Sequence, residues 1–442
     1  MSLVDLSVVQ AALRAVEPVV SMGRVTRVQG LLVEATLPEV AVGTTCDIRI
    51  PHGKAVRADV VGFQGSHALL MSQDGVQGIH AGCPVVARPD GDVIPVGEEL
   101  LGRIVNSRME PMDGKPLPVL KERALLQGRI PPAMLRRRVA KPLCLGIRVI
   151  DTLLTCGEGQ RVGIMAGPGV GKSVLLGMLA RNADADVIVM GLVGERGREV
   201  REFVERDLRG GLARSVVVVA TGDEAPLLRI RAALCATAIA EHFRAKGLRV
   251  LLLVDSLTRV AMAQREIGLA AGEPPTSKGY PPSVFALLPR LLERAGNDDG
   301  KGAITALYTV LAEGDDLSDP VADAARAALD GHIVLSRALA GAGHFPAVDV
   351  QQSVSRVMND IVDKEHRELA RQAREVMSAY REAAPLIDVG AYAKGTNPRV
   401  DRALECIDAL NAFTRQDSAE RTTLLAALTG LRQALQGRGH HG

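Results

Sequence analysis

The chain has 442 residues, of which 47% are hydrophobic and 24% charged, a composition typical of a folded protein with two or three domains. Lys and Arg number 53 against 51 Asp and Glu, and the formal net charge of +2 argues against binding to nucleic acid or an anionic membrane through bulk charge. The six cysteines form no CxxC pair, which argues against zinc and disulfide frameworks and favours a cytosolic protein with reduced thiols.

The N-terminal segment, residues 1–19, is expected to be helical. Apolar residues recur at helical spacing over residues 4–16, which predicts a short amphipathic helix. Asp5 and the lack of a basic stretch before an apolar block argue against a signal peptide. No apolar run reaches the roughly 18 residues that a membrane-spanning helix needs, so membrane contact is expected only through partners.

Three domains are predicted after this segment. Residues 20–95 repeat short Val, Leu and Ile runs between turn residues, which predicts a small antiparallel β-barrel. Over residues 96–350 a Pro- and Gly-rich linker leads into apolar runs that alternate with helical patterns, which predicts an α/β domain with a parallel sheet covered on both faces. Residues 351–442 are charged and helical in pattern and predict a C-terminal helical domain. The sheet strands are expected at RVGIMAG (161–167), DVIVMGLVG (186–194), SVVVVATG (215–222), RVLLLVDS (249–256) and ITALYTVLAEG (304–314).

A phosphate-binding loop is predicted where the first of these strands ends. The segment AGPGVGKS, residues 166–173, has the P-loop spacing, and the helical pattern VLLGMLA follows it. The glycines allow backbone N–H groups to point at phosphate, Lys172 reaches the β- and γ-phosphates of ATP, and Ser173 offers its hydroxyl to Mg²⁺. The alternative, a chance glycine loop, is disfavoured by the strand before it and the helix after it. The predicted nucleotide-binding residues here are Gly167, Pro168, Gly169, Val170, Gly171, Lys172, Ser173 and Val174.

Two carboxylates are candidates for magnesium binding and catalysis. Asp255 ends an apolar strand, where a Walker B carboxylate that holds Mg²⁺ belongs; the alternative is that it caps the next helix. Glu195 lies in the Gly-flanked turn GLVGERGREV at a strand end, where ligands bind in α/β sheets, and we assign it as the general base or water-positioning residue. The alternative for Glu195 is a solvated charge cluster with Arg196, Arg198 and Glu199.

Several long stretches, read together, carry a family resemblance. They are GIRVIDTLLTCGEGQRVGIMAGPGVGKS, GERGREVREF, VDSLTRVAMAQREIGLAAGEPPTSKGYPPSVFALLPRLLERAG and LDGHIVLSRALAGAGHFPAVDVQQSVSR. These stretches resemble the export ATPases of bacterial type III secretion, a family with flagellar and virulence-injectisome members that is related to the catalytic subunit of rotary ATP synthases. The likeness runs from about residue 20 to 415, and the block 272–295 is its most specific part. It implies a RecA-like P-loop ATPase core between an N-terminal β-barrel and a C-terminal helical domain.

The resemblance also implies roles for single residues. Lys172 matches the phosphate position and Glu195 the catalytic glutamate. Arg356, in SVSR, matches an arginine finger that is given to the γ-phosphate bound by the neighbouring subunit. Phe345 stands where the family usually has a Tyr that packs on adenine, and its ring face should keep the stacking. Pro168, which has no N–H, departs from the usual loop start and removes one possible phosphate donor.

The implied protein is a homohexamer with ATP between neighbouring subunits, peripheral at the cytoplasmic face of the inner membrane. Its implied partners are a stator-like regulator at the N-terminus, export chaperones, secreted substrates and, through partners, a membrane export gate. The expected work is to release substrates from chaperones and to promote their unfolding and export. Residues 388–404 and 313–337 look more like flagellar members, whereas 153–167 and 273–296 look at least as much like injectisome members, and we favour the flagellar system.

Two other functions compete with export. A Rho-like hexameric translocase also joins a small β-barrel to a RecA-like core, but nucleic-acid-binding barrels use aromatic platforms and basic grooves. Within residues 1–100 the one aromatic residue is Phe63, and there is no Lys/Arg cluster, so no nucleic-acid partner is expected. A rotary synthase subunit is disfavoured by the block 272–295 and by the short C-terminal helices.

Overall fold

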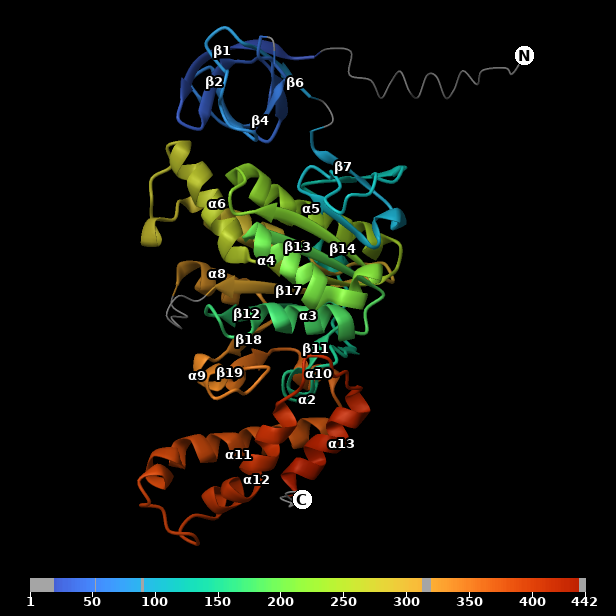
Figure 1. The fold of residues 1–442 in the computed structure, drawn as a ribbon, viewed down its shortest axis with the longest axis vertical. Coiled ribbons are helices and arrows are strands. Elements are labelled where there is room, and N and C mark those ends of the chain that lie inside the picture. The colour runs from blue at the N-terminus through green and yellow to red at the C-terminus, as the bar shows by residue number, and fades with distance from the viewer. Residues whose placement is uncertain (1–19, 52, 89–90, 312–318, 437–442) are drawn as a thin grey trace, which may run out of the picture.

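The computed structural model describes residues 20–51, 53–88, 91–311 and 319–436, so the helix predicted over residues 4–16 lies outside the described part. Along the long axis of the molecule, a β-barrel is followed by an α/β domain and then by a group of helices (Figure 1). This order confirms the fold class predicted from the sequence. The exact domain boundaries stay a prediction.

The N-terminal part is a closed antiparallel barrel whose strands are ordered β1-β2-β5-β4-β3-β6. On β2, Val33 and Ala35 point into the barrel core while their neighbours Leu32, Glu34 and Thr36 are at least partly exposed. This period of two is the pattern of a half-buried strand. The strands are β1 (Met22–Gln29), β2 (Leu32–Thr36), β3 (Thr45–Ile48), β4 (Val56–Gln64), β5 (His67–Ser72) and β6 (Pro84–Ala87).

The middle part is built on a mostly parallel sheet ordered β19-β18-β12-β17-β15-β13-β14-β8. The predicted strands are confirmed as β12 (Arg161–Ala166), β13 (Val187–Glu195), β14 (Ser215–Thr221), β15 (Arg249–Asp255) and β17 (Ala303–Leu311). The strands that the apolar pattern does not predict are β8 (Arg103–Asn106) at one edge, and β18 (Gly331–Leu335) and β19 (Val348–Ser355) at the other. β19 is antiparallel to β18 and extends past residue 350. Because β12, β13, β15 and β17 run parallel, their carboxyl ends meet at one edge of the sheet.

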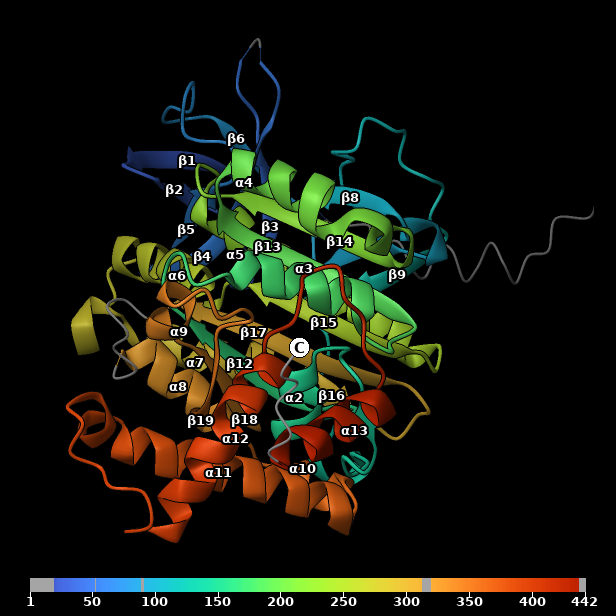
Figure 2. The ribbon, with the colours of Figure 1, turned by 60° about the horizontal axis from the view of Figure 1, so that its bottom comes forward.

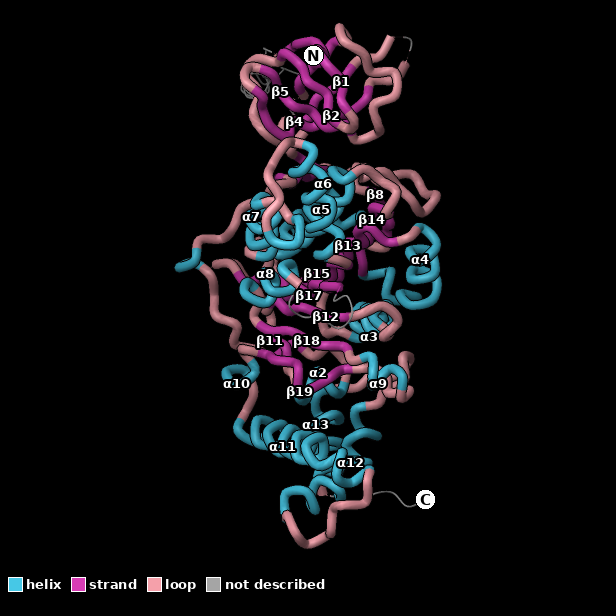
Figure 3. The backbone as a smooth tube through the Cα atoms, turned by 90° about the vertical axis from the view of Figure 1, so that its left-hand side faces the viewer, coloured by secondary structure: helices cyan, strands magenta, loops and turns pink. Residues whose placement is uncertain are grey.

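Helices cover both faces of this sheet (Figure 3). Along β13, Val187 and Val189 belong to the core on one face, whereas Ile188 and Met190 belong to the core on the other. A strand buried on both sides reads as a continuous apolar run, which is why β13 was predictable. The first face is covered by α5 (Pro226–Ala245), α6 (Leu257–Ala270), α7 (Pro282–Leu292) and α8 (Pro320–Ala328), and the second by α3 (Lys172–Asn182) and α4 (Gly197–Glu202).

The C-terminal helices pack against the second face at the β19 end of the sheet (Figure 2). Arg148 N donates to Gln416 Oε1 at 2.8 Å, Arg181 Nη2 to the Ser418 carbonyl at 2.6 Å, and Asn182 Nδ2 to the Glu420 carbonyl at 3.0 Å. Two of these bonds start from the C-terminal end of α3, so the P-loop helix is tied directly to the C-terminal part. The helices concerned are α2 (Arg148–Leu153), α11 (Lys364–Asp388), α12 (Pro398–Thr414) and α13 (Leu424–Leu435).

The remaining strands and α-helices are short. They are β7 (Val93–Val96), which pairs with β9 (Glu122–Leu125); β10 (Pro142–Leu143), which pairs with β11 (Cys156–Gly157); β16 (Gly296–Asn297), which pairs with β17; and the helices α9 (Arg337–Gly341) and α10 (Met358–Ile361).

Candidate nucleotide-binding and catalytic site

The loop between β12 and α3 has the geometry of an anion-binding turn. β12 ends at Ala166 and α3 begins at Lys172. Gly169 and Gly171 take φ values of 77° and 87°, a left-handed conformation that glycine adopts without strain. Val170 is buried and anchors the loop, while Ser173 is exposed in the first turn of the helix. The N–H groups at the start of α3 therefore face an open position suited to phosphate.

Three predicted side chains converge beside this loop. Lys172 Nζ lies 2.5 Å from Asp255 Oδ1 and 3.2 Å from Glu195 Oε1, although the residues come from three separate elements. Burial alone would lower the pKa of Lys172, but the carboxylates of Asp255 and Glu195 outweigh it and raise that pKa above its usual value. The two carboxylates therefore favour the charged form of Lys172 at the carboxyl edge of the sheet.

The same edge carries a cavity of about 110 Å³ that Ser173, Glu195 and Asp255 line together. All three donate oxygen atoms, the ligand type that a hard cation such as Mg²⁺ takes. Within the described ranges, no group of three or more His, Cys, Asp and Glu side chains could hold a metal ion by itself. Mg²⁺ usually binds one or two protein groups and completes its shell with substrate phosphates and water.

Asp255 is held in place by a neighbour that the sequence analysis does not identify. Thr309 Oγ1 donates to Asp255 Oδ1 at 2.6 Å from the adjacent strand β17, and Asp255 is only 5% exposed. Val254 pairs with Tyr308 in the ladder, which brings the next residue of each strand together. The available signal was weak, because Thr309 is one of three hydroxyl side chains, with Thr305 and Tyr308, in the otherwise apolar buried run ITALYTVL.

Glu195 owes its position to the residue before it. Gly194 has φ 76°, and a Cβ placed there would lie 2.9 Å from Cβ and Cγ of Arg259. Only glycine fits both the backbone angle and the close approach of α6. Arg259 Nε has no hydrogen-bond partner in the part of the chain that the structure describes. Arg259 is a second residue beside the site that the sequence analysis does not identify.

Comparison with known proteins places this geometry in a family. Residues 25–88 match the model of the ATP synthase alpha/beta family β-barrel domain, and residues 146–355 match that family's nucleotide-binding domain. Residues 362–433 match the T3SS EscN ATPase C-terminal domain. A flagellum-specific ATP synthase of Bacillus subtilis is 50% identical over 415 residues, which cover 92% of this chain and 94% of that protein. A type 3 secretion system ATPase of Sinorhizobium fredii is 50% identical over 400 residues, covering 90% and 88%.

The chain belongs to the type III secretion and flagellar export ATPases. Solved structures agree: the assembled ATPase EscN of the enteropathogenic E. coli type III secretion system superposes with a TM-score of 0.89 at 41% identity, covering 93% of this chain and 100% of that one. EscN in complex with its central stalk EscO gives a TM-score of 0.86 at 40% identity, with the same coverage. The resemblance predicted from the sequence is confirmed, and the protein is an ATP-hydrolysing enzyme of type III export.

In this export ATPase, Phe345 lies against the P-loop although 174 residues separate it from Gly171 in sequence. A Cβ placed on Gly171 would be 3.2 Å from Cδ1 and Cε1 of the Phe345 ring. The Phe345 carbonyl accepts a 2.9 Å hydrogen bond from Gln416 N, and the residue remains 44% exposed. An exposed aromatic ring beside a phosphate-binding loop is suited to stack on a nucleotide base.

Arg356 lies at the opposite edge of the sheet. Its N–H donates to the Asp330 carbonyl at 3.0 Å, and Asp330 N donates to the carbonyl of Arg161 at the start of β12. The rise of a strand puts Arg161 about 16 Å from Ala166, where the P-loop begins. The exposed guanidinium of Arg356 therefore cannot reach the phosphates bound by its own subunit.

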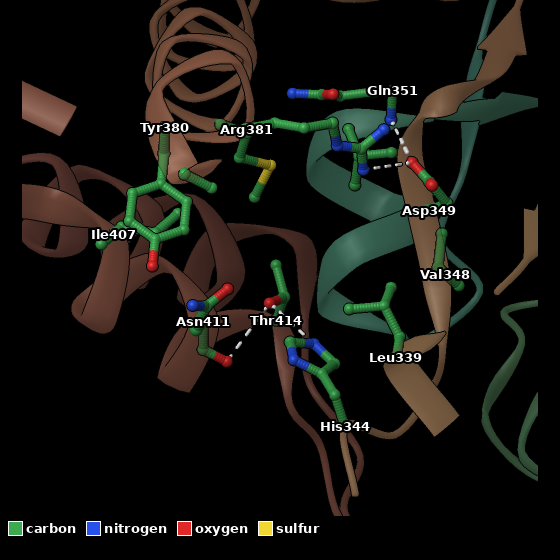
Figure 4. Close-up of a pocket in the computed structure, with 13 residues that line it drawn as sticks. Leu339, His344, Val348, Asp349, Gln351, Tyr380, Arg381, Ile407, Asn411 and Thr414 are labelled. Carbon is green, nitrogen blue, oxygen red and sulfur yellow. Dashed lines mark hydrogen bonds and ion pairs between the residues drawn. The ribbon is translucent and has the colours of Figure 1, made fainter. Parts of the chain in front are cut away.

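A second cavity lies away from the P-loop, where β19 meets α11 and α12 (Figure 4). Its volume is about 290 Å³, and its walls include Val348 and Gln351 on one side and Tyr380 and Ile407 on the other.

In the described part of the chain, no helix is both long and apolar enough to cross a membrane.

Proposed function

We propose that this export ATPase binds Mg·ATP at the carboxyl edge of its sheet and hydrolyses it there. Lys172 binds the β- and γ-phosphates, Ser173 and Asp255 hold Mg²⁺, and Glu195 orients or deprotonates the attacking water. The convergence of Lys172 with Glu195 and Asp255, at 3.2 and 2.5 Å, is the observation that carries the proposal. The chain positions the groups, and Mg²⁺ supplies charge neutralisation on the phosphates when it is bound. The loop residues 167–174 wrap the phosphates, and Phe345 stacks on adenine.

The proposal that the protein forms a ring rests on the distance between the P-loop at one edge of the sheet and Arg356 at the other. Phosphoryl transfer gains about 10³–10⁵ in rate from an arginine that neutralises charge in the transition state. Arg356 lies too far from its own P-loop to act there, so it serves the site of a neighbouring copy. The relative EscN has been solved as an assembled ATPase, which supports the same organisation for this chain. We therefore propose a homohexamer with ATP between adjacent subunits.

The cellular role that we propose is to release export substrates from their chaperones and to promote their unfolding and export, at the cytoplasmic face of the inner membrane. EscN binds a central stalk, which supports a stalk-like partner here in addition to a stator-like regulator at the N-terminus, chaperones, secreted substrates and an export gate. A flagellar apparatus is favoured by residues 388–404 and 313–337. The flagellar relative of Bacillus subtilis and the secretion-system relative of Sinorhizobium fredii are each 50% identical, so overall identity does not decide between the systems.

The direct test is steady-state ATPase activity against protein concentration, with light scattering after size exclusion on the same samples. We expect specific activity to rise as the oligomer forms, and Glu195→Gln to lose turnover while it still assembles. Flat activity from a monomer would contradict the shared site and leave only the P-loop assignment.

The choice of system needs a second experiment in the source bacterium. A strain that lacks this protein is complemented with the parent or with Glu195→Gln, and secreted flagellar and injectisome proteins are compared in the medium. We expect flagellar proteins to return with the parent alone. Selective return of injectisome proteins would contradict the flagellar assignment.

A further inference from the structure

The nucleotide base is expected beside Phe345, which rests on the proposed function that ATP binds at this P-loop. The exposed ring of Phe345 covers Gly171 and presents one stacking face beside the loop. A base stacked on that ring has a second face, which faces water unless another group covers it. The loop that follows α12 is bonded to Phe345, because Gln416 N donates to the Phe345 carbonyl at 2.9 Å.

Arg415 is the residue in this loop that can cover the second face. Its backbone is fixed: its N–H donates to the Asn411 carbonyl at 3.2 Å, its carbonyl accepts from Arg148 Nη2, and the next residue is bonded to Phe345. Its side chain is exposed, and no hydrogen bond or ion pair engages the guanidinium within residues 20–51, 53–88, 91–311 and 319–436. Because the Arg415 backbone is already fixed, its guanidinium can bind a ligand without the cost of ordering the loop.

The segments that carry Phe345 and Arg415 are bonded to each other at two positions. Burial, and after it the positive charge of Arg415, lower the pKa of His344, the residue that directly precedes Phe345. His344 Nε2 in turn lies 3.1 Å from Oγ1 of Thr414, the residue before Arg415 (Figure 4). The two segments 344–345 and 414–416 therefore adjoin each other, and one carries an aromatic ring while the other carries a planar cation.

We propose that Arg415 stacks its guanidinium on the face of the nucleotide base opposite Phe345, so that the base is held between a ring and a planar cation. Arginine stacks on aromatic faces through its flat, weakly hydrated guanidinium, and the attraction is largest where water is excluded. Every base has such a face, so this contact adds affinity for ATP and for GTP alike. Arg415 is a binding residue and takes no part in the transfer of the phosphoryl group.

The test compares Arg415→Ala and Arg415→Lys with the parent in nucleotide binding and in steady-state hydrolysis of ATP and GTP. We expect Arg415→Ala to raise the Kd and KM for both nucleotides about 3- to 10-fold and to leave kcat within about 2-fold. Arg415→Lys keeps the positive charge but loses the planar guanidinium that stacks, so we expect the same rise in Kd and KM as in the alanine variant. Arg402→Ala, an exposed arginine of α12, the helix that precedes this loop, is the matched control and should bind like the parent.

Tripolyphosphate, which has no base, separates stacking from simple attraction to phosphate. Its inhibition constant against ATP hydrolysis should be equal in the parent and in Arg415→Ala. A weaker inhibition in Arg415→Ala, or full affinity in Arg415→Lys, would show that the charge acts on the phosphates and would overturn the proposal. If Arg415→Ala binds ATP as the parent does, the proposal also fails. If the parent itself binds no nucleotide, the proposed function fails instead, so the two failures are distinguishable.

Discussion

The two edges of the central sheet hold their charged side chains in opposite ways. At the carboxyl edge Lys172, Glu195 and Asp255 are mostly buried and pair with one another, so folding alone fixes their positions. At the amino edge Arg356 is exposed, and its guanidinium donates to the Arg326 carbonyl at 3.2 Å. A preorganised cluster acts without reorganising, whereas an exposed arginine gains a fixed geometry only when a second surface meets it. One subunit thus positions Lys172, Glu195 and Asp255 by itself, whereas we propose that the neighbouring subunit supplies Arg356.

The largest effect is expected from Arg356→Ala. Loss of a transition-state cation should lower kcat by about 10³-fold or more, with nucleotide affinity nearly unchanged, because the residue is far from its own P-loop. Single-turnover hydrolysis and equilibrium binding of a fluorescent ATP analogue measure the two quantities.

A mixing experiment sharpens this prediction. Lys172→Ala subunits lack the phosphate lysine but keep Arg356, so an equal mixture with Arg356→Ala subunits should regain activity, with about a quarter of the shared sites complete if the subunits mix at random. No recovery from a mixture that light scattering shows to be co-assembled would refute action across the interface.

The next effect belongs to the carboxyl edge. Glu195→Gln keeps the size of the side chain but removes the base, and kcat should fall by about 10²–10³-fold while ATP still binds. The measurement is the burst and steady-state release of phosphate. An unchanged pH–rate profile with nearly full activity would assign Glu195 to the surface charge cluster instead.

A smaller loss is expected from Gly194→Ala. The new Cβ meets the stem of Arg259 at 2.9 Å on a backbone with φ 76°, so Glu195 must move. We expect kcat to fall roughly 10-fold and the free energy of unfolding to fall by about 1–2 kcal/mol. Gly197→Ala, where the nearest atom is 3.9 Å away and φ is not positive, is the control, and an equal loss there would remove the argument.

The smallest effect is expected from Phe345→Leu. Replacing the ring removes stacking worth about 1 kcal/mol, so the Kd for ATP should rise about 5-fold with little change in kcat. Isothermal calorimetry gives the Kd directly. A variant whose affinity equals that of the parent would show that the base does not contact this ring.

Much of the fold and of the catalytic edge could be predicted from the sequence. The strands around Ile188, Leu252 and Leu307 are buried on both faces and therefore appear as unbroken apolar runs. Glu195 and Asp255 end such strands, Lys172 follows the loop after another, and parallel strands bring their carboxyl ends to one edge. Local patterns were sufficient here because residues at the carboxyl ends of neighbouring parallel strands lie close together in space.

The remaining features depend on contacts that no local pattern carries. β8 is a four-residue strand, RIVN, which joins the sheet edge from within a predicted linker. Thr309 resembles any hydroxyl in a strand until β15 lies beside it. The position of Arg415 next to Phe345 depends on the docking of the C-terminal helices, 70 residues later in the sequence than Phe345. Packing between distant segments created these neighbours.

The helix α3 has a further consequence through its length. Its first residue, Lys172, belongs to the phosphate site, and its last, Asn182, is bonded to the loop that precedes α13. Eleven helical residues form a rod about 16 Å long. Because a helix is stiff along its axis, a tilt of α3 at the phosphate site would also move the residues that are bonded to its other end. The chain thus has a direct, eleven-residue helical connection between the P-loop and the loop that precedes α13.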